Sequence, residues 1–285
     1  MLSKELTYLL EKFLQGDRQL MVLTGAGVSA ESGIPTYRGV EGYWTKGSRN
    51  YKPEEIGTLR FFQKKPEEVW KFALYRRTIC KRAQPNLGHT SIAKLENIFR
   101  DRFTLITQNV DGLHLKAGNS DHRTYQIHGD IDHIRCSLNC TRTLYEFPQE
   151  IGEKKQGEGL TGAEWELLRC PECDAICRPN VLWFDEFYNE RYYRSESALK
   201  IAGKTGLLLI VGTMGTTNLP NQIFDTVRFK QGIVVDINLE DNLFSEEIRD
   251  SRTGFLLRGK SSELLPQLVD EIRKLRGWQP FEESI

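Results

Sequence analysis

The segment that decides the fold reads Gln19-Leu-Met-Val-Leu-Thr24-Gly25-Ala26-Gly27-Val28-Ser29-Ala30. Its apolar first half predicts a short buried strand, and the glycines that follow predict a tight turn into a helix. A turn of the pattern G-x-G-x-x-G/A lets backbone N–H groups approach the pyrophosphate of a dinucleotide. On its own the pattern does not decide between a cofactor site and a structural turn.

Strands and helices alternate along the rest of the chain. Apolar runs at 104–107, 207–211 and 232–237 predict further buried strands, and helical patterns at 6–13, 91–100 and 264–276 alternate with them. This alternation is typical of a parallel sheet in an α/β fold. A hydride-transferring dehydrogenase carries an acid about 20 positions after the glycine turn. No acid stands between Glu41 and Glu54, which disfavours that class of enzyme.

Two segments interrupt the alternation and predict a second, smaller lobe. Residues 41–83 read as turns and helices, with a helix start at Pro66. Residues 131–185 hold two close cysteine pairs around a polar loop, with Pro171 inside the second pair. Both segments read as insertions into the α/β lobe.

The two cysteine pairs predict a structural zinc site formed by Cys136, Cys140, Cys170 and Cys173. Four thiolates on two knuckles make a closed tetrahedral site, which leaves no position for a reacting water. A fifth nearby thiol, Cys177, leaves open which four bind. Reduced, metal-binding thiols in a chain of this length are typical of a reducing compartment, so we expect a cytoplasmic protein.

Charge and hydropathy exclude two classes of partner. The 285 residues carry 39 basic and 39 acidic side chains, so the overall field does not recruit nucleic acid or an anionic membrane. No stretch approaches the roughly 20 apolar residues that span a bilayer. The first fifteen residues predict an amphipathic helix and not a signal peptide.

Polar side chains gather after the strand predicted at 104–107. Gln108, Asn109 and Asp111 follow that strand, and His128 lies in the segment 125–130, just before the first cysteine pair. Carboxyl ends of parallel strands meet at one edge of a sheet, so these side chains can converge on one crevice. Histidine is well suited to proton transfer near neutral pH, although a structural role for His128 is about as frequent for a histidine in this position.

Segments 24–38 and 107–114, His128-Gly129, the two cysteine pairs and Gly212-Thr213 resemble the sirtuins, the NAD-dependent protein lysine deacylases. The resemblance keeps the family's order from about residue 18 to 270 and covers nearly the whole chain. It implies a Rossmann-like parallel-sheet large lobe, an inserted small lobe made of a zinc module and a helical module, and a cleft between them for NAD and an acyl-lysine peptide. The implied boundaries are 1–40, 84–130 and 186–285 for the large lobe, 41–83 for the helical module and 131–185 for the zinc module.

The resemblance also implies roles for individual residues. The residues expected to contact NAD are Gly25, Ala26, Gly27, Ser29, Thr36, Tyr37, Arg38, Gln108, Asn109, Asp111, Gly212, Thr213 and Asn238. Among these, Tyr37 would cover nicotinamide and Arg38 would order that loop. His128 would be the general base and Asn109 a second catalytic residue. The residues expected to meet the acyl-lysine substrate are Ala73, Arg76, Trp183, Phe184, Asp185 and Glu186.

The chemistry implied by the family begins with attack of the acyl-lysine amide oxygen on the ribose carbon that carries nicotinamide. A ribose hydroxyl then attacks the resulting imidate, and neutral His128 removes that hydroxyl's proton. The products are nicotinamide, O-acyl-ADP-ribose and free lysine. Two alternatives remain: a protein mono-ADP-ribosyltransferase or NAD glycohydrolase on the same fold, and a silent NAD-sensing module.

Three departures from the family pattern bear on these expectations. Asp185 replaces the glycine of a Phe-Gly-Glu segment, which predicts a negative charge beside the bound peptide. The segment after Thr213 differs from the family's usual sequence, and the first cysteine pair has three intervening residues where two are commoner. A helix position that holds Tyr in the succinyl-removing branch is Ala73 here, whereas the partner Arg of that branch is present as Arg76. We therefore expect activity on acetyl-lysine, tolerance of longer apolar acyl chains, and secondary activity on succinyl-lysine.

Overall fold

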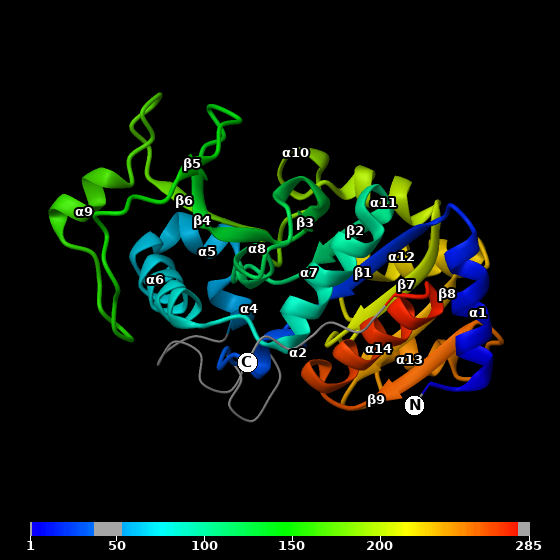
Figure 1. The fold of residues 1–285 in the computed structure, drawn as a ribbon. Helices are drawn as coiled ribbons and strands as arrows, with labels where there is room; N and C mark the ends of the chain where they lie inside the picture. The colour runs from blue at the N-terminus through cyan, green and yellow to red at the C-terminus, as the bar shows by residue number, and fades with distance from the viewer. Residues whose placement is uncertain (1, 37–52, 279–285) are drawn as a thin grey trace.

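The computed structural model describes residues 2–36 and 53–278 and shows two lobes (Figure 1). The larger lobe is built on a six-stranded parallel sheet of order β3-β2-β1-β7-β8-β9. Its strands are β1 Gln19–Thr24, β2 Phe103–Thr107, β3 Thr124–Gln126, β7 Thr205–Val211, β8 Ile233–Asn238 and β9 Gly254–Arg258. Counted within the sheet, this is the 3-2-1-4-5-6 order of dinucleotide-binding folds. The predicted α/β fold with a Rossmann-like parallel sheet is confirmed.

Two apolar cores cover the two faces of the sheet. Side chains alternate along each strand, so Leu20 and Val22 enter one core while Met21 and Leu23 enter the other. The first core is completed by α1 (Lys4–Gln15), α7 (Leu87–Phe99) and α14 (Ser261–Leu275). The second is completed by α11 (Ser195–Ala202), α12 (Asn218–Phe229) and α13 (Leu243–Ile248). Burial on both faces explains why the strands read as continuous apolar runs.

The centre of the sheet holds a topological switch point between β1 and β7. After β1 the chain returns to β2 through α7, which packs on one face, and after β7 it returns to β8 through α12, which packs on the other. The loops that follow β1 and β7 therefore diverge at the carboxyl ends of the two strands. In open α/β sheets the ligand crevice lies at this point.

The smaller lobe combines a helical part and a three-stranded antiparallel sheet. Its elements are α4 Pro53–Ile56, α5 Leu59–Lys64, α6 Pro66–Arg82, β4 Gly129–Cys136, β5 Tyr145–Glu146, α9 Gly162–Leu167 and β6 Cys177–Val181. A common core joins the two parts, and the Trp70 indole N–H donates to the Cys177 carbonyl at 3.1 Å. The ladder of β4 with β6 begins at Gly129, so the boundary predicted between residues 130 and 131 falls inside a strand.

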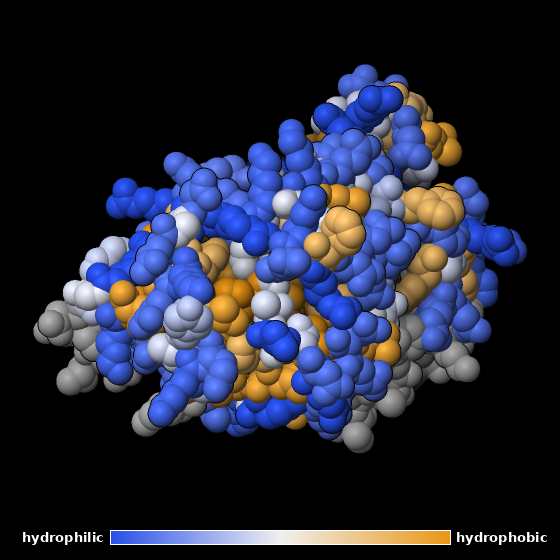
Figure 2. All heavy atoms as spheres, turned by 90° about the vertical axis from the view of Figure 1, so that its right-hand side faces the viewer, coloured by the Kyte–Doolittle hydropathy of each residue, from blue (hydrophilic) through white to orange (hydrophobic). Residues whose placement is uncertain are grey.

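Short helical segments complete the described chain: α2 Gly27–Ala30, η1 Arg100–Arg102, α8 Leu113–Lys116, η2 Asp121–Arg123 and α10 Glu190–Tyr193. Helix α7 begins earlier than the apolar pattern predicts, because the Asn86 side chain accepts from the backbone N–H groups of Gly88 and His89. None of the helices in residues 2–36 and 53–278 has the length and apolarity needed to cross a membrane. On the large-lobe face of Figure 2, hydrophilic side chains surround a smaller apolar area.

Candidate functional site

The glycine turns after β1 and β7 are packed against each other at the switch point. The Gly27 N–H donates to the Gly212 carbonyl at 2.8 Å, and the Gly25 N–H donates to the Val211 carbonyl at 3.0 Å. A Cβ atom on Gly27 would lie 2.7 Å from Gly212 Cα, and one on Gly212 would lie 2.5 Å from Val28 N. Gly212 also has a φ of 61°, which favours glycine. The predicted residues Gly25, Ala26, Gly27 and Gly212 therefore form one close-packed backbone cradle.

Ser29 is the centre of a buried hydrogen-bond network beside this cradle. Its hydroxyl donates to Asp111 Oδ2 at 2.8 Å and accepts from Asn109 Nδ2 at 3.1 Å. His89 Nε2 lies 3.2 Å from the same oxygen. His89 Nδ1 accepts from the Asn86 backbone N–H, so we assign the ring hydrogen to Nε2 and read the third bond as a donation to Ser29. The hydroxyl thus uses one donor and two acceptor positions, its full capacity.

The same network orients Asn109 and Asp111. Asn109 Nδ2 also donates to the Gly25 carbonyl at 3.0 Å, and Asp111 Oδ1 accepts from the Leu113 N–H at 2.9 Å. The two residues are buried, at 7% and 8% exposure. Three predicted cofactor residues, Ser29, Asn109 and Asp111, are therefore brought together in one fixed arrangement. Their roles toward NAD stay predictions.

His89 and His114 belong to this region although the sequence analysis did not select them. Burial lowers the pKa of His89 from 6.5 to about 4. The nearby Asp111 carboxylate has the opposite, smaller effect and raises this pKa. Burial also lowers the pKa of His114, whose Nε2 lies 3.0 Å from the Thr24 hydroxyl. The spacing of Asn86 and His89 is the signal of a helix cap. Nothing local in the sequence places His89 against Ser29, which comes from another element.

Gln108 connects β2 with the segment that follows β7. Its Nε2 donates to Thr213 Oγ1 at 2.8 Å and to the Thr24 carbonyl at 3.3 Å, while its Oε1 accepts from Thr217 Oγ1 at 2.9 Å. These partners fix which end of the amide is oxygen, because a carbonyl can only accept. The predicted residues Gln108 and Thr213 therefore lie together at the switch point.

Asn238 ends β8 at the same edge of the sheet. Its amide donates to the Asp236 carboxylate, which also accepts from Asn242 at 3.0 Å and from Arg258 at 2.9 Å. Asn238 is thus held on the β8 side of the cradle. Thr36 lies at the end of the first described range, whereas Tyr37 and Arg38 lie outside the described residues.

His128 directly precedes β4 and faces a tyrosine. Its Nε2 lies 2.8 Å from the Tyr188 hydroxyl. Burial lowers the pKa of His128 from 6.5 to about 4, a hydrogen bond to the backbone of Gln108 raises it, and the Arg76 charge lowers it further. The imidazole is therefore neutral near pH 7 and can accept a proton.

An apolar cavity lies between α6 and the segment that follows β6. Its lining includes four of the predicted substrate residues: Ala73, Arg76, Trp183 and Phe184. Trp183 is buried and packs under the Arg178 guanidinium, whereas Phe184 is 58% exposed. Val110, next to Asn109, also lines this cavity, which connects it to the carboxyl edge of the sheet.

The other two predicted substrate residues are engaged by protein groups. Glu186 accepts from both Nη atoms of buried Arg178, at 2.6 and 2.7 Å, and from the Trp183 N–H at 3.0 Å. Asp185 accepts from the backbone N–H groups of Leu59 and Arg60 at the start of α5. The negative charge expected beside the peptide is therefore directed toward the helical part of the small lobe.

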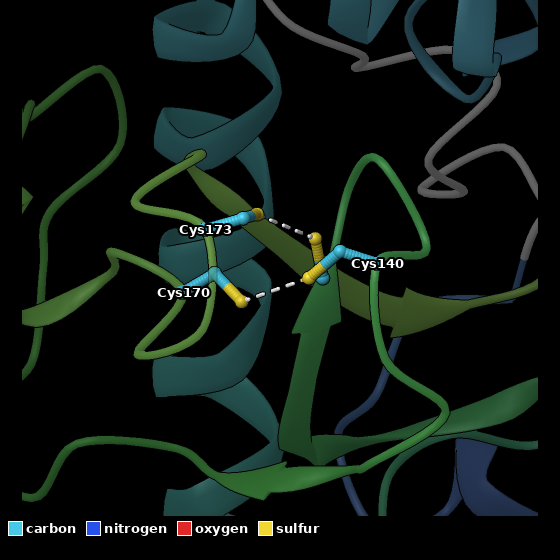
Figure 3. Close-up of side chains that lie close together, drawn as sticks. Cys140, Cys170 and Cys173 are labelled. Carbon is cyan, nitrogen blue, oxygen red and sulfur yellow. Dashed lines mark hydrogen bonds between the residues drawn. The ribbon is translucent and has the colours of Figure 1, made fainter.

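The four predicted metal ligands form one cluster, of which Figure 3 labels Cys140, Cys170 and Cys173. Their sulfur atoms all lie within 4.8 Å of one another. The two contacts that cross between the knuckles are 3.6 Å for Cys136 with Cys173 and 3.5 Å for Cys140 with Cys170. Tetrahedral zinc with bonds of about 2.3 Å places its sulfurs roughly 3.8 Å apart, so the cluster fits this metal. Cys177 lies outside it, and burial raises the pKa of its thiol to about 12.

Comparisons with known proteins agree with this arrangement. The family model described as the Sir2 family matches residues 25–218. An NAD-dependent protein deacylase of Pyrococcus furiosus is 37% identical over 264 residues, which cover 93% of this chain and 97% of that protein. An NAD-dependent protein deacylase of Aquifex aeolicus is 32% identical over 258 residues, 90% of this chain and 97% of that protein.

Solved structures of Sir2 homologues are also similar to this chain. A Sir2 homologue in complex with NAD has a TM-score of 0.76 at 30% identity, covering 96% of this chain and 95% of that one. A mutant Sir2 homologue in complex with 2′-O-acetyl-ADP-ribose has a TM-score of 0.77 at 30% identity, covering 96% of this chain and 97% of that one. This chain belongs to the Sir2 family, the sirtuins.

Proposed function

We infer that this protein is an NAD-dependent protein lysine deacylase, which converts an acyl-lysine protein, NAD and water into the free lysine, nicotinamide and O-acyl-ADP-ribose. The observation that carries this inference is a buried neutral base, His128, whose pKa responds both to the backbone of Gln108 at the switch-point crevice and to the charge of Arg76, which lines the apolar cavity. A nucleotide site and an acyl site that share one base are the minimum this reaction requires. The relatives named as deacylases support the same activity.

The crevice has the features that a dinucleotide requires. Gly25, Gly27 and Gly212 leave the backbone free of side chains where the turns after β1 and β7 meet, so a pyrophosphate can approach closely. Asn109 and Asp111 are already held in fixed positions by their hydrogen bonds to Ser29. When bound, NAD supplies a ribose carbon with a neutral leaving group, nicotinamide.

Each residue of the site then has a task that its surroundings allow. Asn109 and Asp111 would orient the ribose that carries nicotinamide, and such positioning accounts for much of the rate in this type of reaction. The cavity bordered by Ala73, Val110 and Phe184 would bind the acyl chain and hold the amide oxygen toward the ribose. His128 would then take a proton from a ribose hydroxyl, because the imidazole is neutral at pH 7 and one of its nitrogens is unprotonated.

We also propose one structural zinc ion held by Cys136, Cys140, Cys170 and Cys173. The spacing of the four sulfurs supports this, and a site filled by four thiolates serves stability and not catalysis. A reducing compartment such as the cytoplasm is proposed on the same ground, because all six cysteines are free in the structure.

The proposed function is tested by identifying the reaction products. The protein is incubated with NAD and an acetyl-lysine peptide, and the products are identified by mass spectrometry. We expect one nicotinamide and one O-acetyl-ADP-ribose for every peptide that loses its acetyl group. Transfer of ADP-ribose to protein would indicate a mono-ADP-ribosyltransferase instead. Release of free ADP-ribose with an intact peptide would indicate an NAD glycohydrolase. Absence of any NAD-dependent product would overturn the proposal that this protein is an enzyme.

A further inference from the structure

Phe187 has the most exposed of the large apolar side chains in the described part of the chain, at 90% exposure. It lies between β6 and α10, one residue after the predicted substrate residue Glu186. Phe184, three residues earlier, is 58% exposed and lines the apolar cavity. Single exposed apolar residues are common on proteins and need no function. The anchoring of its neighbours sets Phe187 apart from such residues.

The residues on both sides of Phe187 are held in place by the protein. Glu186, before it, accepts from both Nη atoms of the buried Arg178 at 2.6 and 2.7 Å. The ring of Tyr188, after it, packs against the apolar core that contains α11 and α12. The Tyr188 hydroxyl also lies 2.8 Å from His128 Nε2. The backbone at Phe187 is therefore fixed from both directions, and its exposed ring projects from a rigid support.

The segment 182–188, which carries Phe187, is attached to the proposed site at two further points. The Leu182 N–H donates to the His128 carbonyl at 2.9 Å, and the Phe184 N–H donates to the Gly57 carbonyl at 2.9 Å. Leu182, Phe184 and Gly57 all line the apolar cavity. The segment therefore borders the proposed acyl site and contacts the proposed base at the same time.

The position of Phe187 determines which part of a substrate it can meet. Three residues of chain reach at most about 11 Å, so the Phe187 Cα lies within that distance of the Phe184 Cα at the cavity. A bound acyl-lysine would place its side chain in the cavity and its backbone outside it. Because an extended peptide advances about 3.3 Å per residue, positions within three residues of the acyl-lysine lie within reach of Phe187.

A phenyl ring on a fixed backbone can bind an apolar side chain at a low cost in entropy. Its backbone is already ordered and its side chain has few rotatable bonds, so little freedom is lost on binding. The apolar area that the two side chains remove from water stabilises the complex. An aromatic partner adds a contact between rings. A charged partner gains neither effect, because it would lose hydration against an apolar surface.

We propose that Phe187 determines which protein sequences are deacylated, by binding an apolar side chain, best an aromatic one, within three residues of the acyl-lysine. This inference rests on the proposed function and adds to it a preference that lies outside the acyl group. Phe187 contacts the flanking residue of the substrate and takes no part in the transfer of the acyl group.

The kinetic test uses acetyl-lysine peptides of equal length whose other residues are glycine and serine. In each peptide one phenylalanine stands at a different position, up to three residues before or after the acetyl-lysine. We expect at least one position at which phenylalanine raises kcat/KM about tenfold, the size typical of an aromatic anchor, through a lower KM. Phe187→Ala should abolish this gain with kcat unchanged at saturating peptide, and Phe187→Leu should keep part of it.

Phe229→Ala is the matched control, because Phe229 is 82% exposed at the end of α12, and it should leave the peptide preference unchanged. The melting temperature of Phe187→Ala should stay close to that of the unsubstituted protein, since the ring buries little area. A markedly lower value would show a structural role instead. Light scattering tests another occupant of the ring, a second copy of this chain. A dimer that Phe187→Ala dissociates, with the peptide preference unchanged, would overturn the proposal.

A binding test does not depend on turnover. Fluorescence polarisation of the same peptides without NAD should show the same preference in Kd for the unsubstituted protein, and its loss in Phe187→Ala. If the preference is found in binding but no product forms, the proposed function fails and the role of Phe187 stands. If the peptides are deacylated but phenylalanine gives no gain at any position, or Phe187→Ala keeps the gain, the role of Phe187 is overturned and the proposed function stands.

Discussion

The carboxylate of Asp185 accepts a hydrogen bond from the backbone N–H of Leu59 at 2.7 Å, with a second bond from Arg60 at 3.1 Å. Next to it, the Phe184 N–H donates to the Gly57 carbonyl at 2.9 Å. Three bonds thus tie the segment after β6 to the start of α5, at the border of the apolar cavity. Asp185 satisfies two of the four N–H groups that a helix start leaves unpaired.

Asp185→Ala should therefore loosen the segment predicted to hold the peptide. We expect KM for the peptide to rise several-fold with kcat nearly unchanged, and a fall in stability of about 1 kcal/mol, typical of a lost cap. Asp185→Asn keeps one acceptor oxygen and should be intermediate. Steady-state kinetics and thermal unfolding check both effects. An unchanged peptide KM in the alanine variant would show that this tie does not shape the peptide site.

Removal of one predicted zinc ligand should unfold the small lobe. Cys170→Ser should lower bound zinc, melting temperature and activity together, because thiolate ligation couples metal binding to folding. Cys177→Ser is the matched control, since this buried thiol lies outside the four-sulfur cluster, and it should retain one zinc per chain. Metal analysis of the purified variants checks this. A folded, active protein without zinc would contradict the assignment.

The acyl cavity should prefer neutral chains. Its walls are mainly apolar, and Ala73 adds space, so each further buried methylene can add about 0.8 kcal/mol. Arg76 lines the same cavity and can bind a carboxylate, so we expect secondary activity on succinyl-lysine. Arg76→Met should abolish that activity and spare deacetylation. Arg82→Met, which changes an exposed arginine paired with Glu153, is the control.

A preference for succinyl-lysine over every neutral chain, measured with a peptide panel, would show that Arg76 dominates the cavity. Equal loss of both activities in Arg76→Met would instead indicate that Arg76 is needed for both reactions, since its charge also lowers the pKa of His128.

Stability should depend on pH through the buried histidines. The pKa of His128 is lowered from 6.5 in the unfolded chain to about 4 in the folded protein. Between these values the unfolded chain binds more protons, so the free energy of unfolding rises with pH across this window and is lost as the pH falls. His128→Gln should flatten this dependence, whereas His122→Gln, at an exposed histidine, should not. Denaturant unfolding at pH values from 6.5 down to about 4 measures this dependence. If the free energy of unfolding changes equally with pH in His128→Gln and in the unsubstituted protein, burial of the neutral ring is contradicted.

The sequence predicted those parts of the site that depend on local order. The run before Gly25 became β1, and Asn109 and Asp111 lie where polar residues after a buried strand should lie. Their grouping follows from a general rule, that carboxyl ends of parallel strands share one edge.

The contacts that escaped prediction join residues far apart in the chain. His89 meets Ser29, and Tyr188 meets His128, across separations of 60 residues each. No local pattern encodes such pairs, because they depend on how elements far apart in the chain pack together. Asp185 has a distant partner as well, since its carboxylate accepts from a helix start that precedes it by 126 residues, whereas its place beside a bound peptide stays a prediction.

We propose that this protein deacylates lysine with neutral His128 as the base. The most direct test is the rate of O-acetyl-ADP-ribose formation by the unsubstituted protein and by His128→Ala, at saturating NAD and acetyl-lysine peptide. We predict a fall of about 10² to 10⁴, the usual contribution of a general base, with NAD affinity and melting temperature largely retained. A folded His128→Ala variant that forms the product at nearly the unsubstituted rate would show that His128 is not the base.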